Sequence, residues 1–115
     1  MNNDKPYDLE ERTALFGEAV IKFAKKVPVT PVTRRLIDQI VGAGTSVGAN
    51  YREADDGVSK NDFRYKISIC KREARETKFF VRMIVTAVPE LLEEAKPLSQ
   101  EAKELHLIFA KIYRG

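Results

Sequence analysis

Hydrophobic side chains recur every three to four residues along four stretches of the chain, a spacing that places them on one side of an α-helix. The four stretches cover about residues 8–27, 31–54, 60–88 and 99–113. Between the third and the fourth, residues 89–96 are expected to form a short helical turn or a loop. No stretch shows the sustained alternation of apolar and polar residues that is typical of a β-strand. The pattern therefore predicts four amphipathic helices.

Residues that favour the start of a helix stand at the beginning of each stretch. They are Asp8 with Glu11 three residues later, Thr30 before Pro31, Ser59 with Asp62, and Ser99 after Pro97. Such side chains accept hydrogen bonds from the free backbone N–H groups of a first turn. Proline limits the helices at their far ends, because it donates no backbone hydrogen bond. We expect Pro28 to end the first stretch and Pro89 to break or kink the end of the third.

Two glycines, Gly44 and Gly48, lie on the apolar side of the second stretch, and Gly42 lies off it. Each glycine lowers helix stability by about 1 kcal/mol relative to alanine, so a packing reason is expected. The main expectation is that a neighbouring helix approaches this side closely, and a ligand site at the glycines is the alternative. A phosphate-binding loop is disfavoured, because no strand precedes the glycines and no P-loop lysine follows them.

Four amphipathic helices with short connections favour an all-α fold, an antiparallel up-and-down four-helix bundle. The chain of 115 residues suits one such domain over residues 1–115. The third stretch carries apolar residues on a second side, namely Ile69, Phe79, Phe80 and Met83. Large exposed apolar patches usually mark interfaces. We therefore expect these residues to form the contact between subunits of a homo-oligomer.

Composition places the chain among ordinary globular proteins, with 43% hydrophobic and 32% charged residues. It has one cysteine, Cys70, so no disulfide can form within the chain, as is usual in a reducing compartment. Residues 1–11 are polar and acidic and do not resemble a signal peptide. No apolar run approaches the roughly 18 residues needed to span a bilayer. We therefore expect a cytoplasmic protein without a membrane partner.

The net charge of +3 is only mildly basic, but the positive residues of the third stretch are unevenly distributed. Six of them project within about 60° of one another on a helical wheel and would span roughly 33 Å. They are Lys60, Arg64, Lys71, Arg75, Lys78 and Arg82, called the basic ridge below. Such a ridge can follow the phosphate backbone of RNA or DNA without reading sequence. The alternatives are a solvated face, pairing with acids of a neighbouring helix or subunit, and an acidic protein partner.

Residues with catalytic or metal-binding chemistry are sparse, so no enzyme activity, cofactor or metal site is expected. The only histidine, His106, does not follow a glutamate by three residues, as di-metal bundles require, and is expected to be solvated. Cys70 is expected to be a small core residue. A polar group comes from two adjacent helices and comprises Ser46, Asn50, Glu53, Glu73 and Glu76. We expect a structural network of salt bridges and helix caps, with Arg75 as a candidate partner of Glu53.

Three segments carry a family resemblance, and they are residues 44–54 (GTSVGANYREA), 59–63 (SKNDF) and 71–78 (KREARETK). Together they resemble the bacterial four-helix bundle proteins encoded in intervening sequences of large-subunit ribosomal RNA genes. The accessory protein of diversity-generating retroelements is a relative of that family. The resemblance covers nearly the whole chain and is strongest from Leu36 to Ile84. Many members have two arginines just before the Ser-x-x-x-Asn motif, whereas Val41 and Gly42 occupy those positions here.

The resemblance implies an up-and-down bundle that assembles into a ring-like homopentamer and binds RNA or DNA, or a nucleic-acid enzyme. The leading hypothesis is therefore a non-enzymatic, oligomeric protein that binds nucleic acid through the basic ridge. A scaffold that holds protein partners without binding nucleic acid is the alternative. An enzyme built on the Glu53, Glu73 and Glu76 cluster is a third, disfavoured hypothesis.

Overall fold

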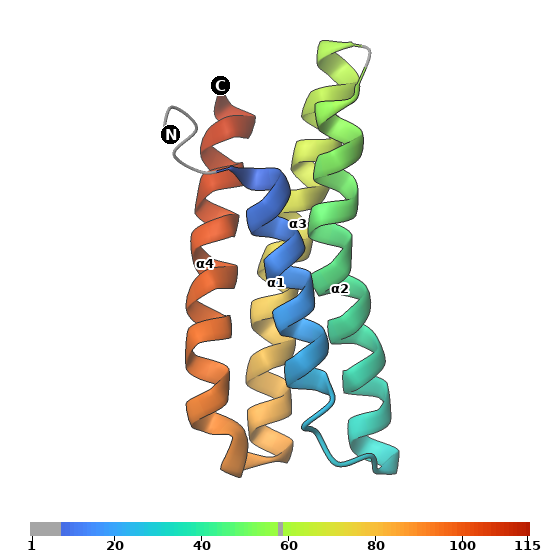
Figure 1. Ribbon diagram of the computed structural model, residues 1–115, viewed down its shortest axis with the longest axis vertical. Helices are drawn as coiled ribbons and strands as arrows, with labels where there is room; N and C mark the ends of the chain where they lie inside the picture. Colours follow the sequence, from blue (N-terminus) through green and yellow to red (C-terminus); the bar gives the residue numbers. More distant parts are fainter. Residues whose placement is uncertain (1–7, 58) are drawn as a thin grey trace.

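The computed structural model describes residues 8–57 and 59–115, which form four long helices and one short 3-10 helix. In chain order they are α1 (Leu9–Ala24), α2 (Pro31–Asp55), α3 (Lys60–Ala87), η1 (Pro89–Leu91) and α4 (Leu92–Arg114). Successive long helices run in opposite directions along the long axis of the molecule (Figure 1). The described residues contain no β-strand. The predicted all-α, antiparallel up-and-down four-helix bundle is therefore confirmed.

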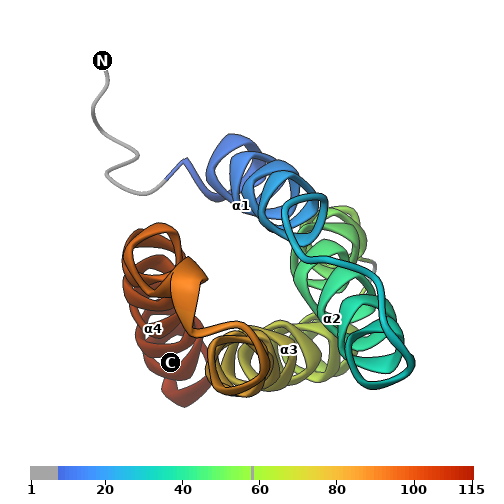
Figure 2. The ribbon, with the colours of Figure 1, turned by 90° about the horizontal axis from the view of Figure 1, so that it is seen from below.

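Helices that follow one another in the chain lie side by side, so α1 to α4 stand in order around the bundle axis (Figure 2). The contact between α2 and α3 is the most extensive, followed by α3 with α4 and α1 with α2. Contact between α1 and α4 is much smaller. The bundle therefore has a loosely closed seam between its first and last helices.

The core is built from the apolar sides of all four helices, as the periodicity predicts. Its largest fully buried apolar side chains are Phe16, Val20, Ile40, Val47, Ile67, Ile84, Leu105 and Phe109. Burying a side chain of this size stabilises the fold by about 1.5–3 kcal/mol relative to leaving it in water. Because each helix is apolar on one side and polar on the other, none in the described part of the chain is long and apolar enough to cross a membrane.

Glycine allows α1 and α2 to approach each other closely. A Cβ atom on Gly44 would lie 2.6 Å from Cγ2 of Val20, and one on Gly48 would lie 3.1 Å from Oγ1 of Thr13. Gly42, in contrast, has open space where its Cβ would stand. The expectation of close helix packing at Gly44 and Gly48 is thus confirmed.

Two of the predicted helix caps form as expected. The Thr30 hydroxyl accepts a hydrogen bond from the Thr33 N–H at 3.1 Å, and the Ser59 hydroxyl accepts one from the Asp62 N–H at 3.0 Å. At Asp8 the prediction is wrong in part. This residue precedes α1, but its backbone is left-handed, with φ of 37°, and its side chain makes no capping hydrogen bond. A side-chain cap normally requires an extended backbone at that position, as Thr30 has.

The start of α4 differs from the sequence-based expectation. The helix begins at Leu92 rather than near Ser99, so Pro97 and Ser99 both lie inside it. Pro97 removes one backbone hydrogen bond, yet burial of Ala95 and Leu98 on either side of it holds this turn against the core. Pro89 does act as expected, since α3 ends at Ala87 and the chain turns through η1.

Candidate nucleic-acid interface

The basic ridge occupies the side of α3 that lies toward α4. Five of its six residues are exposed, and Lys71 is half-buried. The guanidinium of Arg64 donates a 2.8 Å hydrogen bond to the carbonyl oxygen of Tyr113, near the end of α4. It also lies 4.3 Å from the centre of the Tyr113 ring, and Nζ of Lys71 lies 5.0 Å from the same ring. Tyr113 therefore fixes the direction of two ridge side chains without neutralising their charge.

No residue of the basic ridge pairs with a carboxylate anywhere in residues 8–57 or 59–115. The cations that do form ion pairs in those ranges lie elsewhere and are Arg12, Arg52, Lys66, Arg72 and Lys96. The structure therefore does not show the basic ridge paired with acids of a neighbouring helix of the same chain. The ridge presents its positive charge to the surroundings.

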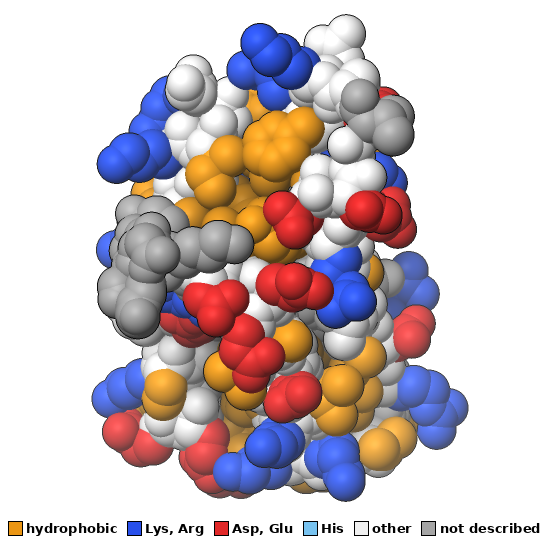
Figure 3. All heavy atoms as spheres, turned by 45° about the horizontal axis from the view of Figure 1, so that its top comes forward, with side chains coloured by type: hydrophobic (Ala, Val, Ile, Leu, Met, Phe, Trp, Pro, Cys, Tyr) orange, Lys and Arg blue, Asp and Glu red, His pale blue; other side chains and the backbone are white. Residues whose placement is uncertain are grey.

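Two acidic residues of α4, Glu101 and Glu104, are turned away from the basic ridge. His106 marks the side of α4 that meets α3, because its Nδ1 lies 3.1 Å from the carbonyl oxygen of Lys71. Glu101 and Glu104 lie on the other side of the helix, where both contact Arg12 of α1. Figure 3 views that side with the end of the bundle tilted forward, and carboxylates gather at its centre. Glu101 and Glu104 thus lie on a different side of the bundle from the basic ridge.

His106 and Cys70 both contact the backbone of a neighbouring helix. His106 is half-buried and contacts α3, which corrects the expectation that it is solvated. Cys70 is fully buried, and its thiol donates to the carbonyl oxygen of Val47 across 3.5 Å. Burial raises the pKa of this thiol to about 12, so it stays protonated at neutral pH. The expectation that Cys70 is a core residue is confirmed.

The polar group on α2 and α3 forms local contacts rather than one network. Asn50 donates a 2.8 Å hydrogen bond to the carbonyl oxygen of Ser46, one turn earlier in the same helix. Glu53 accepts a hydrogen bond from Lys66 of α3, and not from the candidate partner Arg75. The side chain of Glu53 is 61% exposed, so its loss is expected to cost less than a buried charge would.

Glu73 and Glu76 lie one turn apart on the side of α3 next to this group. Burial raises the pKa of Glu73, and the charge of Glu76 raises it further. Arg72, whose guanidinium lies 3.7 Å from Glu73, acts in the opposite direction. Within the described ranges no group of three or more His, Cys, Asp or Glu is placed to hold a metal ion.

The apolar residues expected at a subunit contact lie on an outer face of α3 that borders the basic ridge at Phe79. At about 100° per residue, Ile69, Phe79, Phe80 and Met83 fall within one arc of roughly 100°. Phe79 is 53% exposed, and its ring meets that of Phe80 edge-on at 5.5 Å between centroids. Ile69, Phe80 and Met83 are half-buried. Phe79 is next to the basic ridge on the helix surface, because it follows Arg75 by four residues and precedes Arg82 by three.

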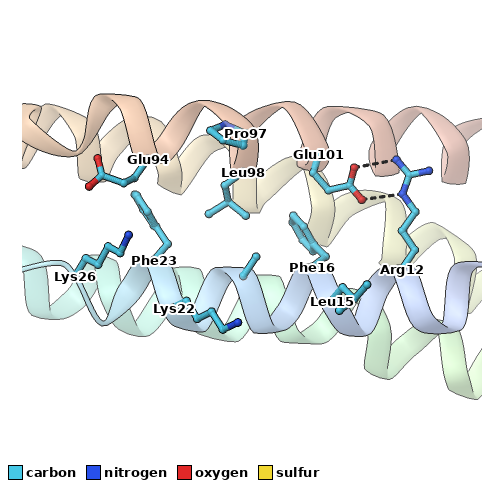
Figure 4. Close-up of a pocket in the computed structure, with 11 residues that line it drawn as sticks. Arg12, Leu15, Phe16, Lys22, Phe23, Lys26, Glu94, Pro97, Leu98 and Glu101 are labelled. Carbon is cyan, nitrogen blue, oxygen red and sulfur yellow. Dashed lines mark hydrogen bonds and ion pairs between the residues drawn. The ribbon is translucent and has the colours of Figure 1, made fainter.

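The structure also brings together residues that the sequence pattern did not single out. Arg12 of α1 forms two hydrogen bonds to Glu101 of α4, at 2.7 and 2.8 Å, and a third to Glu104 at 2.9 Å. They close one end of a hollow of about 360 Å³ between α1 and α4. Phe16, Phe23 and Leu98 point into this space (Figure 4). Arg12 is 89 residues from Glu101 and 92 from Glu104, so helical periodicity alone gives no signal for these contacts.

Comparison with known proteins gives one family and one fold. A sequence model described as the 23S rRNA-intervening sequence protein matches residues 7–111. A crystal structure of a protein with unknown function from the S23 ribosomal protein family of Bacteroides thetaiotaomicron superposes with a TM-score of 0.80. That alignment has 24% sequence identity and covers 92% of this chain and 95% of the other. Among curated proteins, none matches the chain significantly.

Proposed function

Because the chain belongs to the 23S rRNA-intervening sequence protein family, we propose that it is a non-enzymatic homo-oligomer that binds RNA or DNA through the basic ridge. The protein acts in the cytoplasm, and it contacts the phosphate backbone rather than base edges. It needs no cofactor. A nucleic-acid enzyme is a further partner that the family resemblance suggests.

One observation carries the proposal, namely that the ridge is both aligned and unneutralised. Six cations follow one side of α3, and none is paired with a carboxylate in the described ranges. Each phosphate that binds such a residue releases condensed counterions, which is the main source of sequence-independent affinity. Glu101 and Glu104 of α4 contact Arg12 of α1, so these two carboxylates do not repel a strand lying along the ridge.

Self-association is supported by the outer apolar face of α3, where Phe79 leaves half of its surface in water. The resemblance implies five subunits in a ring. Repetition of the ridge in every subunit would turn weak contacts into higher overall affinity, provided that one strand reaches several subunits. The same exposed apolar residues also favour the second candidate function, a scaffold for protein partners that binds no nucleic acid.

Removing ridge charge tests the proposal directly. The double variant Lys78→Gln, Arg82→Gln alters two exposed cations without a carboxylate partner, and Lys22→Gln, Lys25→Gln on α1 is the matched control. Fluorescence anisotropy with a labelled RNA strand, measured over a salt series, gives affinity and salt dependence. The ridge variant is expected to bind more weakly and to flatten the log–log salt slope by about 0.7 for each lost phosphate contact. The control should behave like the wild type.

Light scattering on the same samples separates the two candidate functions. If the ridge cations bind phosphate, the ridge variant keeps the mass of the wild-type oligomer. If they instead pair with acids of another subunit, the variant loses mass. An intact wild-type oligomer that binds no RNA or DNA at low salt would contradict the proposal and favour the scaffold.

A further inference from the structure

The end of the bundle where α2 joins α3 is open and apolar inside. α1 begins level with Arg52 of α2, as the 3.1 Å ion pair between Arg52 and Glu10 shows. Phe63 of α3 and Ile112 of α4 lie beyond that level, where α1 does not cover them. They and Ile108 remain half-buried and line a hollow of about 890 Å³, called the end cup below. Figure 3 shows hydrophobic side chains exposed together at this end.

The charged side chains that line the end cup are all positive. Lys60, Arg64 and Lys111 line it together with the apolar residues, and no acidic side chain is among its nine described lining residues. None of these three cations pairs with a carboxylate in residues 8–57 or 59–115. Lys60 and Arg64 are also the first two residues of the basic ridge. The end cup is therefore continuous with one end of the basic ridge, and it adds the aromatic ring of Phe63.

An aromatic wall with cations around it fits a ligand that is flat and apolar at one end and anionic at the other. An unpaired nucleotide has both parts, since a base can stack on an aromatic ring while its phosphate binds lysine or arginine. A paired base offers no free face to the cup, because its neighbours in the duplex already stack on both sides. Double-stranded nucleic acid could use only the ridge.

We propose that the end cup holds an unpaired base against Phe63, with the flanking phosphates on Lys60, Arg64 and Lys111, so that the protein prefers single-stranded nucleic acid. This inference rests on the proposed binding of a strand to the basic ridge. It extends that binding from the backbone to the base itself. Because every base has an aromatic face, the cup confers a preference for unpaired strands and not for a sequence.

The test compares two strands of equal charge, an oligothymidylate and a strand of the same length whose sugars lack bases. Wild-type protein is expected to bind the oligothymidylate at least about fivefold more tightly, as the stacking of one base would give. Phe63→Leu keeps the wall apolar but removes the ring, so it should abolish this preference and leave binding of the abasic strand unchanged. Circular dichroism confirms that the variant is folded.

A second variant leaves the apolar residues of the end cup unchanged. Lys111 is exposed and lies outside the basic ridge, so Lys111→Gln should weaken binding of the oligothymidylate, whereas Lys22→Gln on α1 should not. Equal wild-type affinity for the two strands would overturn the cup inference while leaving ridge binding intact. Failure of the wild type to bind either strand would instead remove the proposed function. A copolymer of glutamate and tyrosine that binds in a Phe63-dependent manner, without base preference on the strands, would assign the cup to an acidic protein partner.

Discussion

Gly44 of α2 faces Val20 of α1 so closely that a Cβ atom on the glycine would lie 2.6, 2.7 and 2.9 Å from Cγ2, Cγ1 and Cβ of the valine. Rotating the valine side chain would not relieve this contact, because its own Cβ is among the three near atoms. The separation of α1 and α2 at this level is therefore set by the absence of a side chain at position 44.

The first prediction compares two glycines of the same helix. Gly44→Ala should destabilise the fold by about 1–3 kcal/mol, because α1 must move outward to admit the methyl group. Gly42→Ala is the matched control, since open space surrounds that position and alanine is the better helix former. It should stabilise the fold by about 0.5–1 kcal/mol. Thermal and urea unfolding measure both, and effects of the same sign would contradict the packing argument.

The second prediction concerns the two arginine contacts of α1. Arg12→Ala should lower stability by about 1–2 kcal/mol, because a side chain only 26% exposed loses two hydrogen bonds to Glu101 and one to Glu104. Arg52→Ala breaks a single contact to Glu10 between side chains that are 68% and 56% exposed. Its cost should stay below about 0.5 kcal/mol. Similar losses from the two variants in urea unfolding would argue against a special role for Arg12.

The third prediction is a pH dependence at Glu73. Its pKa in the folded protein is raised by burial and by Glu76, so the folded state binds this proton more tightly than the unfolded state does. Protonated Glu73 therefore stabilises the fold at pH values below 4.5, the ordinary pKa of the group. This contribution to the free energy of unfolding is lost as pH rises through the raised pKa of the folded state. Glu73→Gln should be relatively more stable at neutral pH, and its advantage should shrink on acidification. Urea unfolding over a pH series measures this difference.

A matched carboxylate serves as the control for that series. Glu90, exposed at the start of η1, has no ion pair within the described residues. Glu90→Gln should follow the wild-type curve at every pH. A Glu73→Gln curve that ran parallel to the wild type over the whole range would remove the proposed effect of burial.

The fourth prediction addresses self-association. Phe79→Ser should reduce the molar mass in light scattering toward 13.1 kDa, because it removes the most exposed ring of the outer apolar face. Leu107 of α4 is 55% exposed but lies away from that face, so Leu107→Ser should leave the mass unchanged. Loss of mass only in the Leu107 variant would place the subunit contact elsewhere. A monomeric wild-type protein would show that there is no subunit contact.

Features that depend on one helix were predictable from the sequence. The alignment of the basic ridge on α3 follows from the helical repeat alone, and so does the buried side that includes Ile67, Ala74 and Ile84. The start of α4 was missed because Pro97 and Ser99 together have the local form of a helix start. The apolar repeat through Leu91, Ala95 and Leu98 runs past them, and burial of that repeat decides the outcome.

Features that join distant helices could not be predicted in the same way. The contacts of Arg12 with Glu101 and of Arg64 with Tyr113 depend on the rotation of each helix and on the level at which the helices meet. Periodicity fixes which side of a helix is apolar, but it leaves both of those quantities open. The end cup was missed for this reason, since it arises only because α1 begins below the ends of its neighbours.

The order of the helices around the axis has a consequence for how the chain folds during synthesis. Nearly every contact between helices joins elements that are consecutive in the chain, so structure can form hairpin by hairpin as the polypeptide leaves the ribosome. The seam is the exception, because the contact between Arg12 and Glu101 spans 89 residues. Helix α1 is therefore synthesised first but acquires its second neighbour only when α4 has formed.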